Sequence, residues 1–80
     1  MKDKNKYLIQ LGANLRLKRK ELSISQEELA NSADIDRSYV GGIERGERNI
    51  SILTLLKLVN CLKTTLSEIT VNIKDEDYDE

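Results

Sequence analysis

The feature that most constrains this chain is a pair of short helical segments separated by only three residues. Ser25 and Glu28 stand three residues apart in the capping-box pattern, which marks the start of a helix over about 26–33. Asp36 can cap a second helix over about 37–45. Two helices joined by so short a turn have to cross closely, so small and apolar residues are expected between them. These inward-facing residues are Leu29, Ala30, Ala33, Val40 and Ile43.

Apolar spacing and capping residues predict three more helices. A first helix is expected over about 5–22, with one apolar face made by Leu8, Leu11, Leu15 and Leu22. Ser51 can cap a very apolar helix over about 52–62, and Thr65 starts a second capping-box pattern before a short fifth helix. Residues 69–73, ITVNI, alternate as a strand does, so helix and strand both stay open there. The pattern predicts an all-α domain of five helices.

Charge divides the chain into a basic body and an acidic end. The formal net charge is −1, yet residues 1–20 carry a net +6 and residues 74–80 carry a net −4. We therefore expect one domain over residues 1–73, followed by an acidic and disordered tail. Such a division of charge favours a polyanionic partner for the basic body.

The composition makes several kinds of chemistry improbable. The 80 residues include no histidine, so general-base, triad and zinc chemistry lack their usual agent. The carboxylates fall at helix caps and in the tail rather than converging, so we expect no enzyme, no metal site and no cofactor. The single cysteine, Cys61, fits a buried position in an apolar helix. No signal peptide or membrane span is evident, so a cytoplasmic protein without membrane contact is expected.

The order of these elements, with the stretch SQEELANSADIDRSYVGGIERGERNIS, resembles the helix-turn-helix of the lambda-repressor/Cro-like, or Xre-like, family of bacterial and phage regulators. The resemblance covers about residues 8–70, with the helix-turn-helix at about 25–45. Within that family, the phrase DRSYVGGIERGERN is most similar to the controller proteins of restriction–modification systems. The resemblance implies a compact five-helix, lambda-repressor-like DNA-binding domain.

The chain departs from the family at three positions where glycine is common. Asp34 stands in the turn between the paired helices, where aspartate tolerates a left-handed backbone better than most residues. Ser23 and Lys63 replace the other two glycines. We expect both of these replacements to shift the loop geometry without altering the function.

The resemblance implies that the second helix of the pair lies in the major groove of DNA, with its first residues at base edges. Arg37 would contact guanine through two hydrogen bonds, and Ser38 would donate or accept one. Gly41 and Gly42 would let DNA approach the backbone or leave room for Arg37. Phosphate contacts are expected at two helix N-termini and from basic side chains. These residues are Gln26, Tyr39, Arg48, Asn49, Ser51 and Thr54, with Arg16 and Arg19 as weaker candidates.

Some of these assignments have a second interpretation. Arg37 would otherwise contact phosphate, and the ring of Tyr39 would pack or support Arg37. The two glycines would otherwise mark an exposed helix face without a specific role. Glu44 is expected in a structural ion pair with Arg16 or Arg19 rather than in contact with DNA.

A domain of this size reads about half of a DNA site, so the resemblance also implies a symmetric homodimer on a two-fold operator. The expected dimer surface consists of Leu53, Leu66, Ile69, Val71 and Ile73, although the same residues would also serve to close a small core. The expected function is a transcription regulator of double-stranded DNA, controlling restriction–modification genes and its own promoter without a small-molecule ligand. The alternative is an antitoxin-type or phage-type regulator whose C-terminal segment binds a protein partner.

Overall fold

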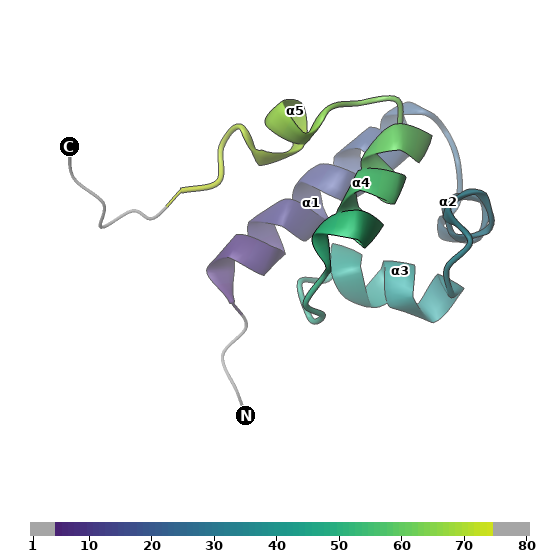
Figure 1. The fold of residues 1–80 in the computed structure, drawn as a ribbon, viewed down its shortest axis with the longest axis horizontal. Helices are drawn as coiled ribbons and strands as arrows, with labels where there is room; N and C mark the ends of the chain where they lie inside the picture. Colours follow the sequence, from purple (N-terminus) through teal and green to yellow (C-terminus); the bar gives the residue numbers. More distant parts are fainter. Residues whose placement is uncertain (1–4, 75–80) are drawn as a thin grey trace.

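The computed structural model describes residues 5–74, and these residues form five helices and no strand (Figure 1). The helices are α1 (Lys6–Glu21), α2 (Gln26–Ala33), α3 (Arg37–Glu44), α4 (Ile52–Cys61) and α5 (Leu66–Thr70). The predicted all-α fold of five helices is confirmed. The open question after α5 is also decided, because the helix ends at Thr70 and residues 71–72 form a turn. Residues 75–80, most of the predicted acidic tail, lie outside the described part of the chain.

Side-chain caps mark the start of all five helices, and in α1 the Asn5 side chain accepts from the N–H groups of Tyr7 and Leu8. The Ser25 hydroxyl accepts a hydrogen bond from the Glu28 N–H at 3.0 Å, and the Glu28 carboxylate accepts one from the Ser25 N–H at 2.8 Å. The predicted capping box of α2 is therefore present. Asp36, Ser51 and Thr65 each accept a backbone N–H from the first turn of α3, α4 and α5. These local hydrogen bonds satisfy backbone donors that a helix leaves without an internal partner.

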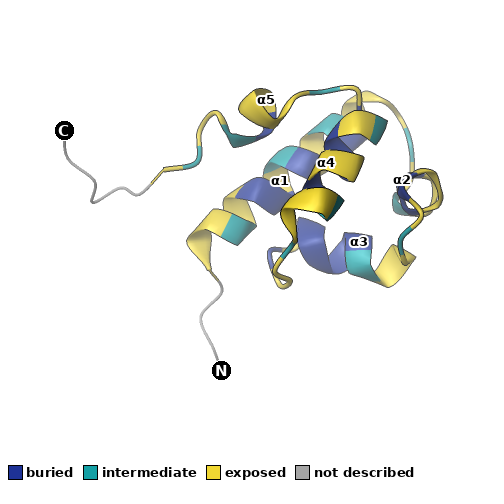
Figure 2. Cartoon of the chain, viewed as in Figure 1, coloured by how far each residue is buried: buried dark blue, intermediate teal, exposed yellow. Residues whose placement is uncertain are grey.

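The hydrophobic core lies where the five helices meet, with α1 packed on α3 and α5, and α2 packed on α3 and α4. Figure 2 shows buried residues along α1, α2, α3 and α4, with an unbroken buried run at the end of α3. The buried apolar side chains are Leu11, Leu15, Leu29, Ala30, Ala33, Val40, Ile43, Leu55, Leu58, Val59, Leu62 and Ile69. All five inward-facing residues predicted for α2 and α3 are among them. Leu22 is an exception to the predicted face of the first helix, because it follows the last residue of α1 and is exposed. None of the helices in residues 5–74 is both long and apolar enough to span a membrane.

Helix α1 approaches the end of α3 closely at Gly12. A Cβ atom on Gly12 would lie 2.3 Å from the carbonyl oxygen of Ile43 and 2.6 Å from the carbonyl oxygen of Glu44. Both oxygens belong to the backbone, so neither can move unless α3 moves. The missing side chain at Gly12 therefore permits the observed distance between α1 and α3.

The end of α5 is fastened to α1 by one amide side chain. The Asn14 Nδ2 group donates to the carbonyl oxygen of Ile69 at 2.6 Å and to the Oδ1 atom of Asn72 at 2.9 Å. The side chain of Ile69 is fully buried. Hydrogen bonds from Asn14 therefore join the first helix to the last helix and to the turn that follows it.

Three residues other than glycine have a left-handed backbone at the ends of helices. Ser23, Asp34 and Lys63 have φ angles of +59°, +59° and +56°. In each case the next residue donates its N–H back into the helix, as when Ile35 donates to the carbonyl of Ala30 at 3.0 Å. The expectation that Ser23 and Lys63 would change the loop geometry is therefore wrong. Both loops keep the conformation that favours glycine, at the steric cost of a Cβ atom.

We expect Lys63→Gly to stabilise the domain, because glycine adopts this backbone without that steric cost. The gain is about 0.5 kcal/mol, since glycine also gives the unfolded chain more conformational freedom. For a domain of this size, the melting temperature would rise by roughly 2–4 °C. The matched control is Lys57→Gly within α4, which should cost about 1 kcal/mol. If thermal unfolding shows that the two substitutions change the melting temperature in the same direction, the explanation is contradicted.

Candidate nucleic-acid interface

The first turn of α3 presents two polar side chains to solvent. Arg37 and Ser38 are both exposed. The carboxylate of Asp36 accepts hydrogen bonds from the N–H and the hydroxyl of Ser38. The hydroxyl bond of Ser38, with its N–H bond, lowers the pKa of Asp36 below its usual range. The Ser38 hydroxyl proton is thus engaged within the turn, and its oxygen remains the group able to accept from a DNA base.

The paired glycines of α3 are buried, so they do not mark an exposed helix face as in the second interpretation. A Cβ atom on Gly41 would lie 3.1 Å from the Nη1 atom of Arg45, and one on Gly42 would lie 2.6 Å from the Cγ atom of Arg48. Two arginine side chains from beyond the end of α3 therefore lie over the glycines. The sequence-based prediction placed DNA directly against the helix backbone at these glycines and did not include the two arginine side chains.

Arg48 also contacts Tyr39 on the same side of α3 as the glycines. The guanidinium carbon of Arg48 lies 5.0 Å from the centre of the Tyr39 ring, within the range of a cation–π interaction. The Tyr39 hydroxyl donates to the carbonyl oxygen of Asn49 at 3.2 Å. The Tyr39 ring also packs against the core from a half-buried position. The packing interpretation of Tyr39 is thus confirmed, and its hydroxyl ties α3 to the loop before α4.

Arg45 belongs to the same surface, although it was not predicted there. Its side chain is about half exposed and lies over Gly41, while its Nε atom pairs with a Glu47 carboxylate oxygen at 3.0 Å. The sequence did hold a signal for this placement, since Arg45 follows Gly41 by four residues and so falls on the same helix face. Together, the exposed arginines on this surface are Arg37, Arg45 and Arg48.

Glu44 is the centre of a buried polar cluster behind this surface. Its two carboxylate oxygens accept from the Nε and Nη2 atoms of Arg19 at 2.7 and 3.0 Å. Oxygen Oε1 also accepts from the amide of Gln26 at 3.0 Å and from Arg16 at 3.4 Å. Burial opposes the charge on Glu44, but the hydrogen bonds from Arg19 and Gln26 outweigh it, so the pKa of Glu44 is lowered. The predicted structural ion pair is confirmed, and it involves both arginines.

This cluster changes the interpretation of three predicted phosphate contacts. Arg19 is buried, and its remaining Nη1 atom donates to the carbonyl of Ile24 at 2.8 Å, so its assignment to DNA phosphate is wrong. Gln26 lies at the start of α2 as predicted, but its amide donates to Glu44. Arg16 is the most accessible of the three, with about half of its side chain exposed.

The start of α4 is the second helix N-terminus that was predicted to contact phosphate. The Ser51 hydroxyl accepts from the Thr54 N–H at 3.1 Å and donates to the Thr54 hydroxyl oxygen at 3.0 Å. The side chain of Asn49 is exposed just before this cap. A ten-residue helix therefore begins beside the arginine-bearing loop, and its N-terminus attracts an anion.

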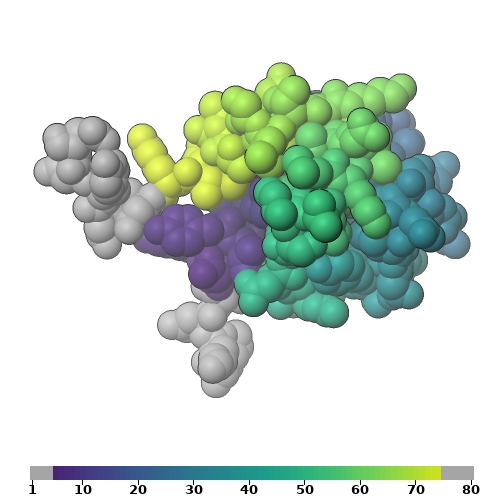
Figure 3. Space-filling model, viewed as in Figure 1, coloured from purple at the N-terminus to yellow at the C-terminus, as the bar shows by residue number. Residues whose placement is uncertain are grey.

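Helices α4 and α5 lie side by side on the face shown in Figure 3, and they and the turn after α5 carry a set of exposed apolar side chains. We call it the α4–α5 surface, and its exposed members are Ile52, Leu53, Leu56, Leu66 and Val71. Leu53 and Val71 are 70 % and 80 % exposed, which is unusual for such side chains within a folded domain. Ile69 was predicted on this surface, but that placement is wrong because its side chain closes the core. Ile73 is half-buried at the edge.

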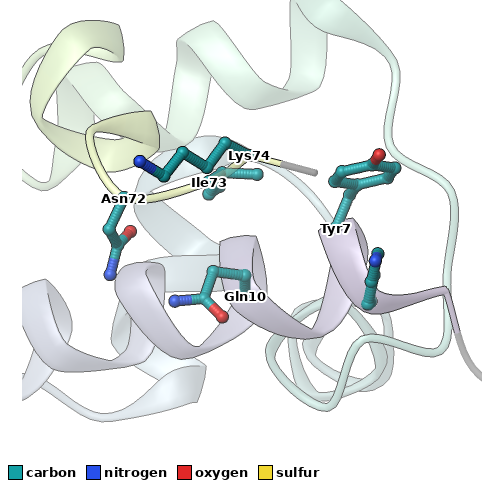
Figure 4. Close-up of a pocket in the computed structure, with 6 residues that line it drawn as sticks. Tyr7, Gln10, Asn72, Ile73 and Lys74 are labelled. Carbon is teal, nitrogen blue, oxygen red and sulfur yellow. The ribbon is translucent and has the colours of Figure 1, made fainter. Parts of the chain in front are cut away.

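The start of α1 and the segment after α5 enclose one small hollow (Figure 4). Its volume is about 70 Å³, and it is lined by Lys6, Tyr7, Gln10, Asn72, Ile73 and Lys74. Pockets that bind small molecules are typically several times larger. Among the described residues, no three histidine, cysteine or acidic side chains gather as a metal site would require.

The fold and the arginine-bearing surface around α3 define a class of protein. Helices α2 and α3, joined by a three-residue turn, form a helix-turn-helix, and a family model described as helix-turn-helix matches residues 15–69. The chain therefore belongs to the helix-turn-helix family, in its Xre-like branch. Within that family it is a transcription regulator homologous to restriction–modification controller proteins, as its relatives establish.

Two controller proteins illustrate the relationship. The chain is 41 % identical over 73 residues to the control protein C.MunI of Mycoplasma sp., covering 90 % of this chain and 99 % of the relative. The crystal structure of the controller protein C.AhdI from Aeromonas hydrophila has 43 % identity and a TM-score of 0.79, covering 81 % of this chain and 98 % of that one.

A third relative is known together with DNA. The structure of the C.Esp1396I tetramer in complex with its natural 35 base-pair operator has 28 % identity to this chain and a TM-score of 0.77. The similarity covers 86 % of this chain and 91 % of that one.

Proposed function

We propose that this protein is a homodimeric transcription regulator that binds a two-fold operator in double-stranded DNA, and that it controls restriction–modification genes and its own promoter. The observation that carries the proposal is the exposed start of α3, where Arg37 and Ser38 extend from a helix whose other side is anchored in the core. The relative that binds its operator as a tetramer supports the same role. Such a regulator acts in the cytoplasm and needs neither catalysis nor a cofactor.

The surroundings of α3 supply the charge that a DNA backbone requires. Exposed arginines run from Arg37, the first residue of α3, to Arg45 and Arg48 beyond its end. The helices α2 and α4 both begin next to this surface, since Gln26 lies near Gly41 and Asn49 is bonded to Tyr39. Two helix N-termini and three arginines thus surround one short helix. This arrangement suits a helix held in the major groove by phosphate contacts on either side.

We expect Arg37→Ala to remove the preference for the cognate operator and to leave salt-sensitive, non-specific binding. A bidentate arginine contact contributes about 1–3 kcal/mol of discrimination at each half-site. The measurement is selection of bound sites from random DNA, followed by titration of the selected and a scrambled duplex at several salt concentrations. Lys63→Ala is the control, because this exposed cation follows α4. An equal loss of affinity on both duplexes would contradict base reading by Arg37.

The α4–α5 surface is the proposed contact between two subunits. We expect Leu53→Asp to weaken the dimer by about 100-fold or more, because two leucines leave the interface and two charges enter it. The control is Leu17→Asp on α1, which is also more than half exposed but lies outside that surface. Equilibrium sedimentation distinguishes the two variants. A wild-type monomer at all concentrations, or equal effects of the two substitutions, would exclude this dimer surface.

A further inference from the structure

We propose that Gly42 and Tyr39 are positioning residues that hold the side chain of Arg48 in a fixed orientation for DNA. We call the two residues the Arg48 platform. The inference deepens the proposed function and rests on it, because Arg48 contributes to regulation only if the protein binds DNA. It also gives the paired glycines of α3 a role that differs from direct contact with DNA.

Gly42 is the part of the platform that contacts the aliphatic portion of Arg48. A Cβ atom at this position would lie 2.6 Å from the Cγ atom and 3.4 Å from the Cδ atom of Arg48. The Cγ atom is only two bonds from the Arg48 backbone, so it moves away only if the whole side chain rotates. The aliphatic part of Arg48 therefore fills the space that any other residue at position 42 would occupy.

Tyr39, one helical turn before Gly42, is the part of the platform that contacts the guanidinium of Arg48. Its ring faces the Arg48 guanidinium at 5.0 Å. Its hydroxyl donates to the carbonyl oxygen of Asn49, the residue directly after Arg48. The same tyrosine thus fixes both the charged group of Arg48 and the backbone that carries it, so less of that side chain's freedom is lost when DNA is bound.

The backbone gives no other reason for glycine at this position. Gly46 is the glycine with a left-handed backbone in residues 5–74, whereas Gly42 is an ordinary residue of α3. Alanine is a better helix former than glycine. The lack of a side chain at Gly42 therefore accommodates Arg48 rather than a special conformation.

The neighbouring Gly41 provides a matched comparison. A Cβ atom there would lie 3.1 Å from the Nη1 atom of Arg45 and 3.6 Å from the amide oxygen of Gln26. The Nη1 atom is the far end of a flexible side chain, which can move aside at little cost. Gly41→Ala should therefore leave Arg48 in place.

The test is a double-mutant cycle on the selected operator duplex with the full-length protein. We expect Gly42→Ala and Arg48→Ala each to reduce affinity by roughly tenfold per half-site, as for loss of a charged hydrogen bond. The double variant should be no weaker than Arg48→Ala alone. A loss from Gly42→Ala that persists in the Arg48→Ala background would mean that the methyl group itself obstructs DNA, and would overturn the proposal. A large fall in melting temperature for Gly42→Ala would overturn it as well.

A second measurement tests the platform without DNA. Because the Arg48 side chain lies against an aromatic ring, its methylene protons should show ring-current shifts in the NMR spectrum. Gly42→Ala and Tyr39→Leu should remove these shifts, whereas Gly41→Ala and Tyr39→Phe should retain them. Unchanged shifts in Gly42→Ala would overturn the platform. If the wild-type protein selects no DNA sequence, the proposed function fails, and the NMR measurement still decides whether the platform exists.

Discussion

Replacing Gly12 with alanine is expected to cost about 3 kcal/mol or more, a large part of the stability of a domain this small. The added Cβ atom would lie within 2.3–2.8 Å of three backbone atoms of Ile43 and Glu44. Overpacking against side chains typically costs about 1–3 kcal/mol, and a contact with rigid backbone belongs at the upper end of that range or beyond it. Small domains have only about 5–15 kcal/mol of stability in total. Urea and thermal unfolding measure the loss.

The same substitution at Gly41 is the control for this prediction. Gly41 is also a buried helical glycine, but its nearest neighbour is the end of the Arg45 side chain. Gly41→Ala should therefore gain helix propensity and leave stability unchanged or raised. If Gly12→Ala is as stable as Gly41→Ala, the close contact between α1 and α3 is not what holds the two helices in place.

Replacing Glu44 with alanine is the second change with a large expected effect. Arg19 would keep its charge in a buried site without its carboxylate partner, and the amide of Gln26 would lose an acceptor. Removal of one partner of a buried ion pair typically costs about 3–5 kcal/mol. The matched control is Glu47→Ala, three residues further on, because Glu47 pairs with Arg45 at the surface and should contribute about 0–1 kcal/mol. Equal unfolding free energies for the two variants would show that burial gives Glu44 no special weight.

The acid dependence of stability gives an independent measure of Glu44. Its pKa is lowered in the folded protein, so folding favours the ionised form. That contribution is present above the ordinary glutamate pKa and is lost as the pH falls through the lower folded value. Glu44 should therefore make the stability of the wild type fall with pH below about pH 4.5, the range in which free glutamate is protonated. In Glu44→Gln this component should be absent, and an unchanged acid profile would contradict it.

The helix boundaries were predictable because their signals are local. Ser25, Asp36, Ser51 and Thr65 act on backbone groups two or three residues away, and four of the observed helices begin directly after them. The inward-facing residues followed from helical spacing in the same way. Ser23 and Lys63 misled the prediction because loop conformation depends on the helix end as a whole, and the hydrogen bonds there outweigh the cost of a Cβ atom.

The details of the site depend on contacts distant in sequence, which spacing does not reveal. Arg19 resembles any cation on a basic helix until Glu44, 25 residues later, is placed against it. Gly12 lies in a helix with nothing unusual around it, and its importance comes from the backbone of α3. Ile69 belongs to an apolar pattern that fits a core and a dimer surface equally well, and only the fold distinguishes the two.

The attachment of α5 to α1 has a consequence for the synthesis of this protein. The side chain of Ile69 completes a core that begins at Leu11. Asn14 donates hydrogen bonds to Ile69 and Asn72, which follow it by 55 and 58 residues. A growing polypeptide that has released α1 to α4 from the ribosome still lacks the helix that closes its interior. Chains that terminate early would therefore keep apolar surface exposed and become substrates for proteases. Only molecules that include α5 therefore have a closed core and escape this degradation.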